Sequence, residues 1–365
     1  MQDADVIIIG GGPAGSTCAG QLRAGGLDVL IVDKAEFPRG KLCSGWITPG
    51  VLDDLKLDVQ DYSRERVFQP MSGFAIGTIG GPSVRVDYGR TVSYGILRRQ
   101  FDDYLLRRCG ARLALSENVR SIERQDDAWI VNGQYRAAML VAAGGHFCPV
   151  ARLLGQATQR GPVISAQEME IELTPQQESA CPVARHSPEL FFCDDLLGYG
   201  WCFRKGNHLN VGLGRVDPQQ LPNRVQDFYQ WLKREGRVPD NLPTQFPGHA
   251  YLTYDQAARP LAAEGVLWIG DSAGLAHSES GEGIHPAIQS GLMAAETVLA
   301  ARGDYRIEAL DAYRRCMEAH FGPRQANVSP PRTISNFRRR LARWLLRQRW
   351  FVRRVVLDRW FLRVR

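Results

Sequence analysis

The sequence lacks the cysteine patterns that would indicate a metal site or a disulfide framework. Its eight cysteines include no Cys-x-x-Cys pair and no spacing typical of metal ligands. They are Cys18, Cys43, Cys109, Cys148, Cys181, Cys193, Cys202 and Cys316. We therefore expect no bound metal, and we interpret the cysteines as reduced thiols of a cytoplasmic protein, most of them small core residues.

Long apolar runs are also absent. No stretch approaches the roughly 20 apolar residues that a membrane-spanning helix needs. The first apolar run has no basic region before it and is too short for the core of a secretory signal peptide. With 44% hydrophobic and 23% charged residues, the chain has the composition of a soluble globular protein, and its 365 residues allow two interleaved lobes.

Acidic residues are scarce at one end of the chain. Residues 331–365 hold twelve arginines and a single acid, Asp358, which gives a local charge of +11. The whole chain carries +6, so the other 330 residues carry −5. Because a mildly acidic body does not attract phosphates, we expect no nucleic-acid partner.

The most informative stretch comprises the first 33 residues. Asp5–Gly10 is an apolar run typical of a buried parallel strand, and it leads directly into Gly10–Gly15, Gly-Gly-Gly-Pro-Ala-Gly. Ser16–Ala24 can continue as a helix. Asp28–Val32 predicts a second buried strand that ends at Asp33.

This spacing is typical of a dinucleotide-binding unit. Gly10 permits the tight turn, Gly12 lets a pyrophosphate approach the backbone, and Gly15 lets helix and strand pack closely. Pro13 suits a first helical turn, and Asp33 is placed to accept hydrogen bonds from ribose hydroxyls. An ordinary βαβ unit with a glycine-rich turn is the alternative, which the strands, helix and acid together disfavour. We predict that the chain binds an adenine dinucleotide.

The middle of the chain predicts a mixture of loops, strands and helices. Residues 34–46 are rich in proline and glycine and predict a loop, where functional groups concentrate. Residues 67–95 alternate polar and apolar residues, as strands of a mixed sheet do. A helix is expected from Ile96 to about Cys109, and a β-meander over 112–141 with a hairpin turn at Asn132-Gly133.

The second half predicts a separate lobe and then a return to the first sheet. Residues 163–215 alternate again and predict a largely antiparallel sheet. A helix is expected over 223–236. Gly265–Ile269 is an apolar strand that leads into Gly270-Asp271, and a long helix follows from about Ile284 to Arg302.

Three separated motifs occur in the order found in one enzyme family. They are the N-terminal fingerprint, Gly270–Gly274 (Gly-Asp-Ser-Ala-Gly) and Ser280–Ile284 (Ser-Gly-Glu-Gly-Ile). On these motifs the chain resembles the FAD-dependent oxidoreductases of the para-hydroxybenzoate hydroxylase fold, over nearly its whole length. Pro38–Gly45 is similar to the cysteine-containing flavin loop of their geranylgeranyl reductase branch, and Gly198–Phe203 is similar to that branch's aromatic cavity motif.

The resemblance implies an α/β fold. A Rossmann-type FAD-binding domain of the three-layer ββα kind would be interleaved with an antiparallel-sheet substrate domain and followed by a C-terminal helical tail. The expected divisions are 1–162 (FAD-binding, with inserted strands 67–95), 163–260 (substrate lobe), 261–305 (the rest of the FAD-binding domain) and 306–365 (helical region with the basic tail).

The resemblance also implies FAD as cofactor. Asp271 would bond a ribityl hydroxyl, and the helix after Gly283 would aim its N-terminus at the flavin N1/C2 region, where the helix dipole favours the negative charge of reduced flavin. Arg98 fits the arginine near the pyrophosphate, with an exposed surface arginine as the alternative. The full implied set is Gly10, Gly12, Pro13, Ala14, Gly15, Asp33, Lys34, Lys41, Cys43, Ser44, Arg98, Gly270, Asp271, Gly281, Gly283 and Ile284.

Two positions depart from the family pattern. The aromatic motif normally ends in Phe-Pro, whereas here Phe203 is followed by Arg204. The motif expected after the third strand appears as Gly144-Gly145-His146, without its acid. Both departures bear on the substrate more than on the cofactor.

Cys43, Tyr199 and Trp201 are the catalytic candidates. Lys41 and the flavin-facing loop would favour a thiolate or a usable proton donor at Cys43, and packing of the thiol against the isoalloxazine is the alternative. Tyr199 and Trp201 would line an apolar cavity or donate protons. Three further residues near the same helix start are candidates for proton relay, namely His277, Glu282 and His285.

The basic tail, 331–365, predicts one or two amphipathic helices. One helical face gathers Phe337, Leu341, Trp344, Leu345, Phe351, Val352 and Val355, and the arginines opposite or beside it are Arg340, Arg343, Arg347 and Arg354. This composition favours an interfacial helix on anionic lipid. The alternative is a helix docked on the acidic body. A tail that caps the substrate cavity is compatible with both.

The leading functional hypothesis is reduction of carbon–carbon double bonds in an apolar, isoprenoid-like or lipidic substrate, by hydride from reduced flavin N5. The alternative is an FAD-dependent monooxygenase that hydroxylates or epoxidises an aromatic or polyketide-like substrate through a flavin hydroperoxide. Because no second dinucleotide fingerprint exists, NAD(P)H or another electron donor would bind transiently. The expected location is the cytoplasm, with peripheral contact at the inner face of the membrane through 331–365.

Overall fold

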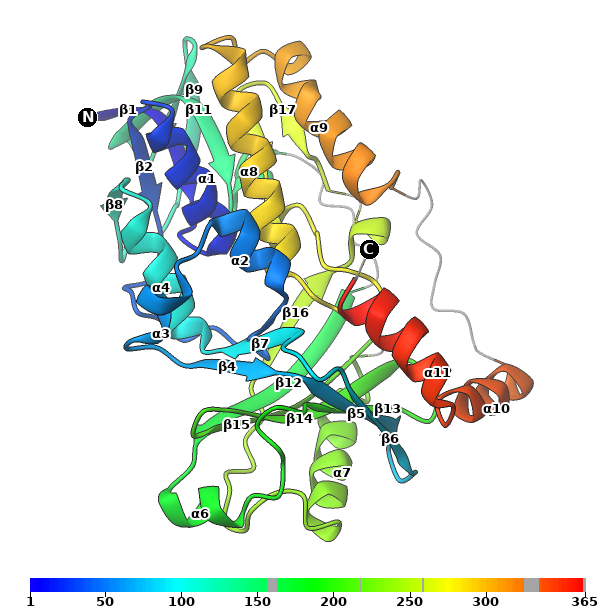
Figure 1. Ribbon diagram of the computed structural model, residues 1–365. Helices are drawn as coiled ribbons and strands as arrows, with labels where there is room; N and C mark the ends of the chain where they lie inside the picture. The colour runs from blue at the N-terminus through cyan, green and yellow to red at the C-terminus, as the bar shows by residue number, and fades with distance from the viewer. Residues whose placement is uncertain (156–162, 217, 258, 325–334, 364–365) are drawn as a thin grey trace.

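The residues that the structure describes form three β-sheets flanked by helices (Figure 1). The computed structural model describes residues 1–155, 163–216, 218–257, 259–324 and 335–363. The eight-stranded sheet with its helices lies at one end, and the seven-stranded sheet lies at the other (Figure 1).

The first sheet has eight strands in the order β17-β18-β11-β1-β2-β8, and the hairpin β9–β10 is attached to β11. The buried runs predicted as strands form β1, β2 and β18, and β1 lies parallel to both β2 and β11. Unlike the predicted meander, β8 pairs in parallel with β2. The strands are β1 Gln2–Ile9, β2 Val29–Val32, β8 Arg112–Ala114, β9 Ile122–Gln125, β10 Ala128–Val131, β11 Tyr135–Ala142, β17 Ala262–Ala263 and β18 Val266–Trp268.

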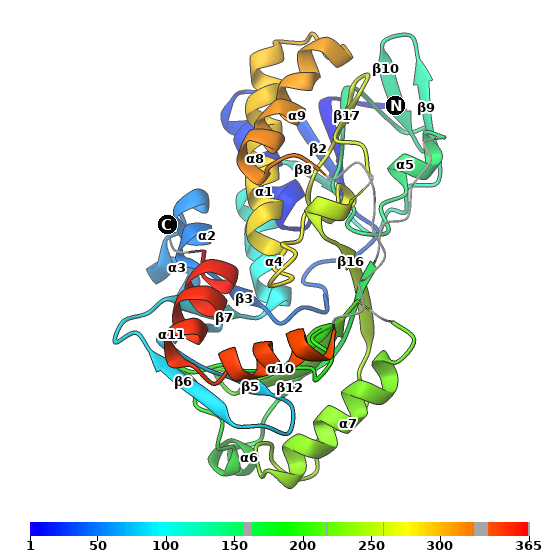
Figure 2. The ribbon, with the colours of Figure 1, turned by 90° about the vertical axis from the view of Figure 1, so that its right-hand side faces the viewer.

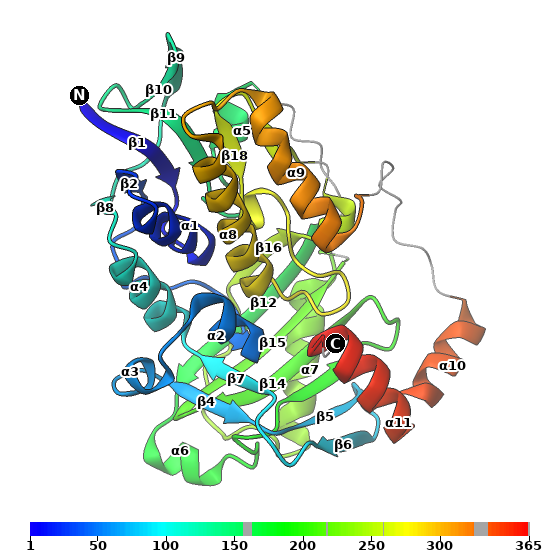
Figure 3. The same ribbon diagram turned by 45° about the horizontal axis from the view of Figure 1, so that its top comes forward.

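Two helices from opposite ends of the sequence pack together on this sheet. They are α1 (Pro13–Ala24) and α8 (Ile284–Ala301), which lie side by side in Figures 1 and 3. They touch backbone to backbone, because a Cβ built on Gly291 would lie 2.6 Å from the Ala14 carbonyl oxygen. In Figure 2 these helices stand on one side of the sheet and β9–β10 on the other, which is the three-layer ββα arrangement that we predicted. The helix α9 (Ile307–Phe321) packs beyond α8.

The second sheet has seven strands in the order β16-β12-β15-β14-β13-β5-β6. Its pairs are antiparallel except β13 with β5. The helix α7 (Leu221–Arg234) covers the face away from the first sheet, and its apolar residues share one core with the strands. The strands are β5 Gly73–Thr78, β6 Ser83–Asp87, β12 Val163–Glu172, β13 Glu189–Phe192, β14 Gly198–Lys205, β15 His208–Arg215 and β16 Gly248–Leu252.

A small sheet of β3 (Trp46–Ile47), β7 (Ser93–Ile96) and β4 (Phe68–Met71) lies between the two large ones. The expected domain boundaries stay a prediction. The strands β5 and β6 come from the stretch 67–95, which we expected as an insertion in the FAD-binding domain, and they form one edge of the second sheet. The remaining helices are α2 Pro49–Leu55, α3 Val59–Ser63, α4 Arg98–Arg108, α5 Val150–Leu153, α6 Pro175–Ala180, η1 Tyr254–Gln256 and η2 Gly270–Ser272. Neither α2 nor α3 was predicted.

The C-terminal tail divides into two parts that behave differently. The first helix, α10 (Asn336–Leu345), projects from the body in Figure 1 and has no buried residue, and its Arg343 donates to the Asp194 carbonyl oxygen at 3.3 Å. The second part, α11 (Arg349–Phe351) and the π-type helix η3 (Val352–Phe361), packs into a core cluster with the second sheet. The docked alternative therefore describes the second part of the tail, and the interfacial alternative stays a prediction for α10. Residues 331–334 and 364–365 lie outside the described residues.

No helix in the described ranges has the length and hydropathy that crossing a bilayer requires.

Candidate active site

The N-terminal turn requires glycine at two of its positions. Gly10 has φ +111°, and a Cβ there would lie 2.5 Å from the Ala143 carbonyl oxygen. A Cβ on Gly15 would lie 2.0 Å from the Gly10 carbonyl oxygen, so any side chain would push α1 off β1. Helix α1 starts at Pro13 with Gly12 as its N-cap and has no side-chain cap. The N–H groups of its first turn, which includes Ala14, are therefore available to an anion.

The acid at the end of β2 is held in place by the backbone. The Asp33 carboxylate accepts hydrogen bonds from the N–H groups of Gly11 (2.7 Å) and Ala35 (2.9 Å). These bonds fix the carboxylate beside the glycine turn. Its contact with a ribose stays a prediction, as does any role of the exposed Lys34.

Two arginines share one buried carboxylate beside the turn. Arg98 donates two hydrogen bonds of 2.8 Å to Asp102, and Arg39 Nη2 lies 3.4 Å from the same carboxylate. Arg98 is only 7% exposed, so the alternative of a surface arginine is wrong. A Cβ on Gly12 would meet only Arg39, at 3.5 Å. The cluster keeps one net positive charge beside an open backbone, which suits a pyrophosphate.

The two motifs far along the chain meet at the other end of the same site. A Cβ on Gly283, the N-cap of α8, would lie 3.4 Å from Asp271 Oδ1. Lys41 Nζ lies 3.9 Å from Asp271 Oδ2. The Gly270 N–H donates to Ser290 Oγ (2.9 Å), which ties η2 to α8. Asp271 is partly exposed, so its carboxylate remains accessible to a ligand hydroxyl.

Arg259, which we did not predict as a site residue, connects η2 to residues 144–146, the segment in which the family's acid is missing. Arg259 Nη1 donates to the Asp271 carbonyl oxygen (3.0 Å), and Nη2 donates to the His146 carbonyl oxygen (2.9 Å). Burial and the Arg259 charge lower the pKa of His146. Arg259 therefore holds 144–146 in place beside the predicted ribityl contact.

These features fit an FAD. Two helix N-termini whose N-cap is glycine converge on the site, at Gly12 and Gly283. The arginine cluster lies near the N-terminus of α1, and the accessible carboxylate of Asp271 lies near the N-terminus of α8. The residues present would hold the pyrophosphate at α1, the ribityl chain near Asp271 and the flavin ring at the start of α8.

Next to this site lies a cavity whose walls are mainly apolar. The space among its side chains, with its mouth, is about 750 Å³. It is lined by Cys43, Ser44, Trp46, Phe74, Ala166, Glu168, Pro188, Leu190, Tyr199, Trp201, Phe203, His249, Tyr251, Ser280, Gly281, Glu282, Gly283, Ile284 and Phe361. The cysteine loop, the aromatic strand and the start of α8, which we predicted from separate motifs, all meet here.

The strand β14 presents alternate residues to the cavity. Tyr199, Trp201 and Phe203 line it. The Tyr199 hydroxyl donates to the Ser280 carbonyl oxygen, and Trp201 Nε1 donates to Asn210 Oδ1 at 2.6 Å. Because both polar groups are bonded within the protein, we propose that these two catalytic candidates shape the cavity.

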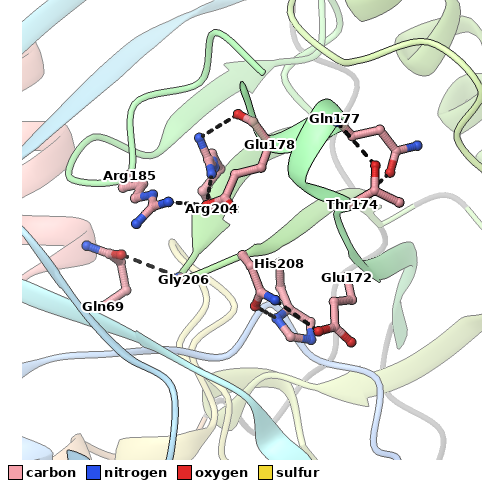
Figure 4. A network of polar contacts seen from close by, with 10 residues as sticks. Gln69, Glu172, Thr174, Gln177, Glu178, Arg185, Arg204, Gly206 and His208 are labelled. Atoms are coloured by element: carbon pink, nitrogen blue, oxygen red, sulfur yellow. Dashed lines mark hydrogen bonds and ion pairs between the residues drawn. The ribbon is translucent and has the colours of Figure 1, made fainter. Parts of the chain in front are cut away.

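Arg204, which replaces the expected proline, lies on the opposite side of β14. Its Nη2 donates to Glu178 Oε1 of α6 at 2.8 Å, and Arg185 bonds the same carboxylate (Figure 4). A capping box of Thr174 and Gln177 starts α6. The departure from the family motif is therefore accommodated outside the cavity.

The cysteine loop is tied to the substrate sheet by a buried lysine. Lys205 Nζ donates to the Ser44 carbonyl oxygen (2.7 Å) and pairs with Glu170. The Gly45 N–H approaches Cys43 Sγ at 3.4 Å. Arg98 interacts with the Cys43 thiol, whereas Lys41, the cation that we expected there, lies beside Asp271. These contacts hold the thiol at the edge of the cavity.

Several ionisable groups in or near the cavity are perturbed by burial. Burial raises the pKa of Glu282 to about 7 and lowers the pKa of His249 to about 4. Burial also lowers the pKa of His277 to about 3. His285 Nε2 lies 2.8 Å from Asp54 Oδ2, outside the cavity lining. Glu168 of β12 also lines the cavity. We did not predict it as a site residue, although an acid in a strand of alternating polarity was a signal for it.

Comparison with known proteins agrees with this arrangement. A family model described as FAD dependent oxidoreductase matches residues 5–79. The chain is 26% identical to the digeranylgeranylglycerophospholipid reductase of Methanocaldococcus jannaschii over 87% of this chain and 83% of that protein. It is 29% identical to the menaquinone reductase of Mycobacterium tuberculosis over 80% of this chain and 76% of that protein.

Solved structures share the fold. A geranylgeranyl bacteriochlorophyll reductase-like protein from Thermoplasma acidophilum superimposes with a TM-score of 0.75 and 22% identity, over 95% of this chain and 88% of that one. A halogenase mutant in complex with FAD superimposes with a TM-score of 0.68 and 18% identity, over 87% and 74%. The predicted fold and cofactor are confirmed. The chain is an FAD-dependent oxidoreductase that is similar to the geranylgeranyl reductases.

Proposed function

We propose that this enzyme reduces carbon–carbon double bonds of an apolar, isoprenoid-like or lipidic substrate. The observation that supports this most is the cavity, whose aromatic walls meet the Cys43 loop and the start of α8. Such walls bind a hydrocarbon chain by excluding water. The curated relatives named above are reductases of a lipid and of a quinone.

Bound FAD, when reduced, would supply a hydride to the substrate. Tyr199, Trp201 and Phe203 would orient the chain along β14, and Phe361 of η3 would exclude water from the far side. The N-terminus of α8 would stabilise negative charge on the reduced cofactor. Cys43 would form the wall at the point where substrate and cofactor meet.

Anaerobic mixing tests this function. The enzyme is reduced with dithionite and then mixed with an unsaturated prenyl ether lipid or with menaquinone. We expect the flavin to be reoxidised and a saturated bond to appear in the product. If no olefin reoxidises the flavin, but oxygen with an aromatic substrate does and labelled oxygen enters the product, the enzyme is a monooxygenase.

The electron donor is proposed to be NAD(P)H or another reductant that binds transiently. The described residues contain a single glycine fingerprint, which the FAD would occupy. A donor would therefore reach the flavin from outside and leave again. Stopped-flow reduction by NADPH and NADH under anaerobic conditions measures this step directly.

We also propose peripheral contact of α10 with an anionic membrane surface. Phe337, Leu341 and Trp344 follow the helical spacing i, i+4, i+7, and Phe337 and Trp344 are 75% and 56% exposed. Arg338 and Arg340 are exposed on the same helix. An exposed apolar stripe beside arginines is the pattern of an interfacial helix. A membrane is also the phase in which a lipidic substrate would reside.

A further inference from the structure

One acid in the substrate cavity has no assigned role. Glu168 lies on β12 and lines the cavity together with Cys43 and Trp201. The residue is 1% exposed, and neither carboxyl oxygen makes a hydrogen bond of regular geometry among the described residues, although the Asn210 side chain lies close enough to lower its pKa. Burying a carboxyl without hydrogen bonds lowers the stability of the fold, which suggests that this group has a function.

The strand explains why the carboxyl faces the cavity. Side chains alternate along β12, where Ala166 and Glu168 line the cavity and Met169 packs in the core beneath. Across the sheet Glu168 pairs with Gly212 of β15. A Cβ on Gly212 would lie 2.6 Å from the Glu168 Cβ, so the missing side chain makes room for the acid.

The surroundings keep this carboxyl neutral. Burial raises the pKa of Glu168 to about 8, and Glu170 adds to the rise. The Lys205 and Arg98 charges and the Asn210 side chain lower the pKa, but Lys205 is paired with Glu170 and Arg98 with Asp102, so the effect of burial prevails. Near neutral pH the group is therefore a carboxylic acid.

The other polar groups of the cavity are less suited to give up a proton. The Tyr199 hydroxyl is already donated to Ser280. His249 is neutral because burial lowers its pKa to about 4, and burial raises the pKa of Tyr251 well above its usual value. Burial raises the pKa of Glu282 only to about 7, because the backbone N–H of His285 at the start of α8 favours the anion, so less of Glu282 than of Glu168 is protonated at neutral pH.

We propose that Glu168 donates the proton that completes reduction of the substrate double bond. This inference rests on the proposed function. The carboxyl O–H bond breaks and a C–H bond forms at one alkene carbon, while the hydride supplied by reduced FAD brings its electron pair to the other. The Lys205 charge, although shared with Glu170, favours the carboxylate that remains, which takes a proton from water before the next turnover.

Glu168→Gln tests this assignment, with Glu172→Gln as its matched control. Glu172 lies on the same strand but is exposed and binds Asn207. Loss of a general acid predicts single-turnover olefin reduction slower by about 100-fold or more in Glu168→Gln. Glu172→Gln and the wild type should match. In the wild type the rate should fall as pH rises through about 8, because the acid is then ionised.

A second measurement does not depend on turnover. Infrared spectra of the resting enzyme should show a protonated carboxyl at neutral pH that disappears above pH about 8. It should be missing from Glu168→Gln and present in Glu172→Gln. Because Glu282 titrates nearby, the wild-type minus Glu168→Gln difference isolates the band.

The outcomes separate the proposal from the function on which it rests. If the wild type reduces an olefin and Glu168→Gln does so at the same rate, Glu168 is not the donor and the reductase function stands. If Cys43→Ala, rather than Glu168→Gln, removes the pH dependence above about 8, the thiol is the donor. If the wild type reduces no olefin, both proposals fail together.

Discussion

Among single residues, Glu168 links the stability of the fold to pH. Its carboxyl has an ordinary pKa of 4.5, which burial raises to about 8 in the folded chain. Between these values the folded protein holds a proton that the unfolded chain releases. Stability is therefore full below pH about 4.5 and falls as pH rises to about 8, by at most about 1.4 kcal/mol per pKa unit.

We expect Glu168→Gln to remove this pH dependence. Its Tm should be close to that of the wild type at pH about 4.5, and should exceed it by a margin that grows up to pH about 8. Thermal unfolding across this pH range measures the difference, and Glu172→Gln should follow the wild type throughout. A margin that is constant with pH would show that Glu168 is already ionised in the folded protein.

The same residue shows how far sequence reasoning reaches at this scale. The roles of Gly10 and Gly15 were predicted because they depend on the local turn alone. Glu168 and Arg39 were missed, since their positions depend on strand register and on packing between elements far apart in sequence. An acid at an inward position of an alternating strand is the signal that could have identified Glu168.

At the scale of elements, the two parts of the tail should differ in their response to truncation of an aromatic side chain. Phe361 of η3 is buried, with its ring 5.5 Å from Tyr199 and 6.2 Å from Trp46. We expect Phe361→Ala to lower stability by about 3–5 kcal/mol and to widen the cavity. Phe337→Ala makes the same change on exposed α10 and should cost less than about 0.5 kcal/mol. Equal losses in chemical denaturation would contradict the division of the tail.

The exposed helix α10 should bind vesicles through its apolar stripe. Removing Leu341 and Trp344 together as alanines should weaken binding to anionic vesicles by about tenfold or more, because both side chains would be buried in the interface. Leu113→Ala is the control, since Leu113 is 40% exposed on β8 and Leu341 is 44% exposed on α10. Co-sedimentation measures the partition. Unchanged binding in the double variant would rule out α10 as the contact.

Elements were predicted well where their periodicity was strong and poorly where local signals conflicted. The strands β12, β14 and β15 lie within the stretch 163–215 that we predicted as an antiparallel sheet, and the helices α1, α7 and α8 follow their predicted ranges closely. The short helix α2 starts at Pro49-Gly50, which indicates a loop when seen without its neighbours. Which part of the tail is buried depends on the apolar surface of the rest of the protein. The sequence of the tail alone therefore could not predict it.

For the whole molecule, the FAD site joins segments from both ends of the chain. Gly12 and Asp33 come from the start, Arg98 from the middle, and Asp271 and Gly283 from beyond residue 270. Because only the folded chain assembles this set, removing FAD should lower the Tm of the entire protein. Restoring FAD at about 100 times its Kd should add about 2.7 kcal/mol. Riboflavin, which lacks the adenylate half, should restore less, and an unchanged Tm with FAD would contradict the site.

The alternation along β14 has a consequence for how this enzyme can change over evolutionary time. Tyr199, Trp201 and Phe203 meet the cavity, whereas Gly200 and Cys202 pack toward α7. Substitutions at the first set alter which molecule fits, and substitutions at the second alter whether the lobe folds. Mutations on one face of β14 thus change substrate selectivity, and mutations on the other face change folding. Selectivity can therefore evolve in small steps while the fold stays the same.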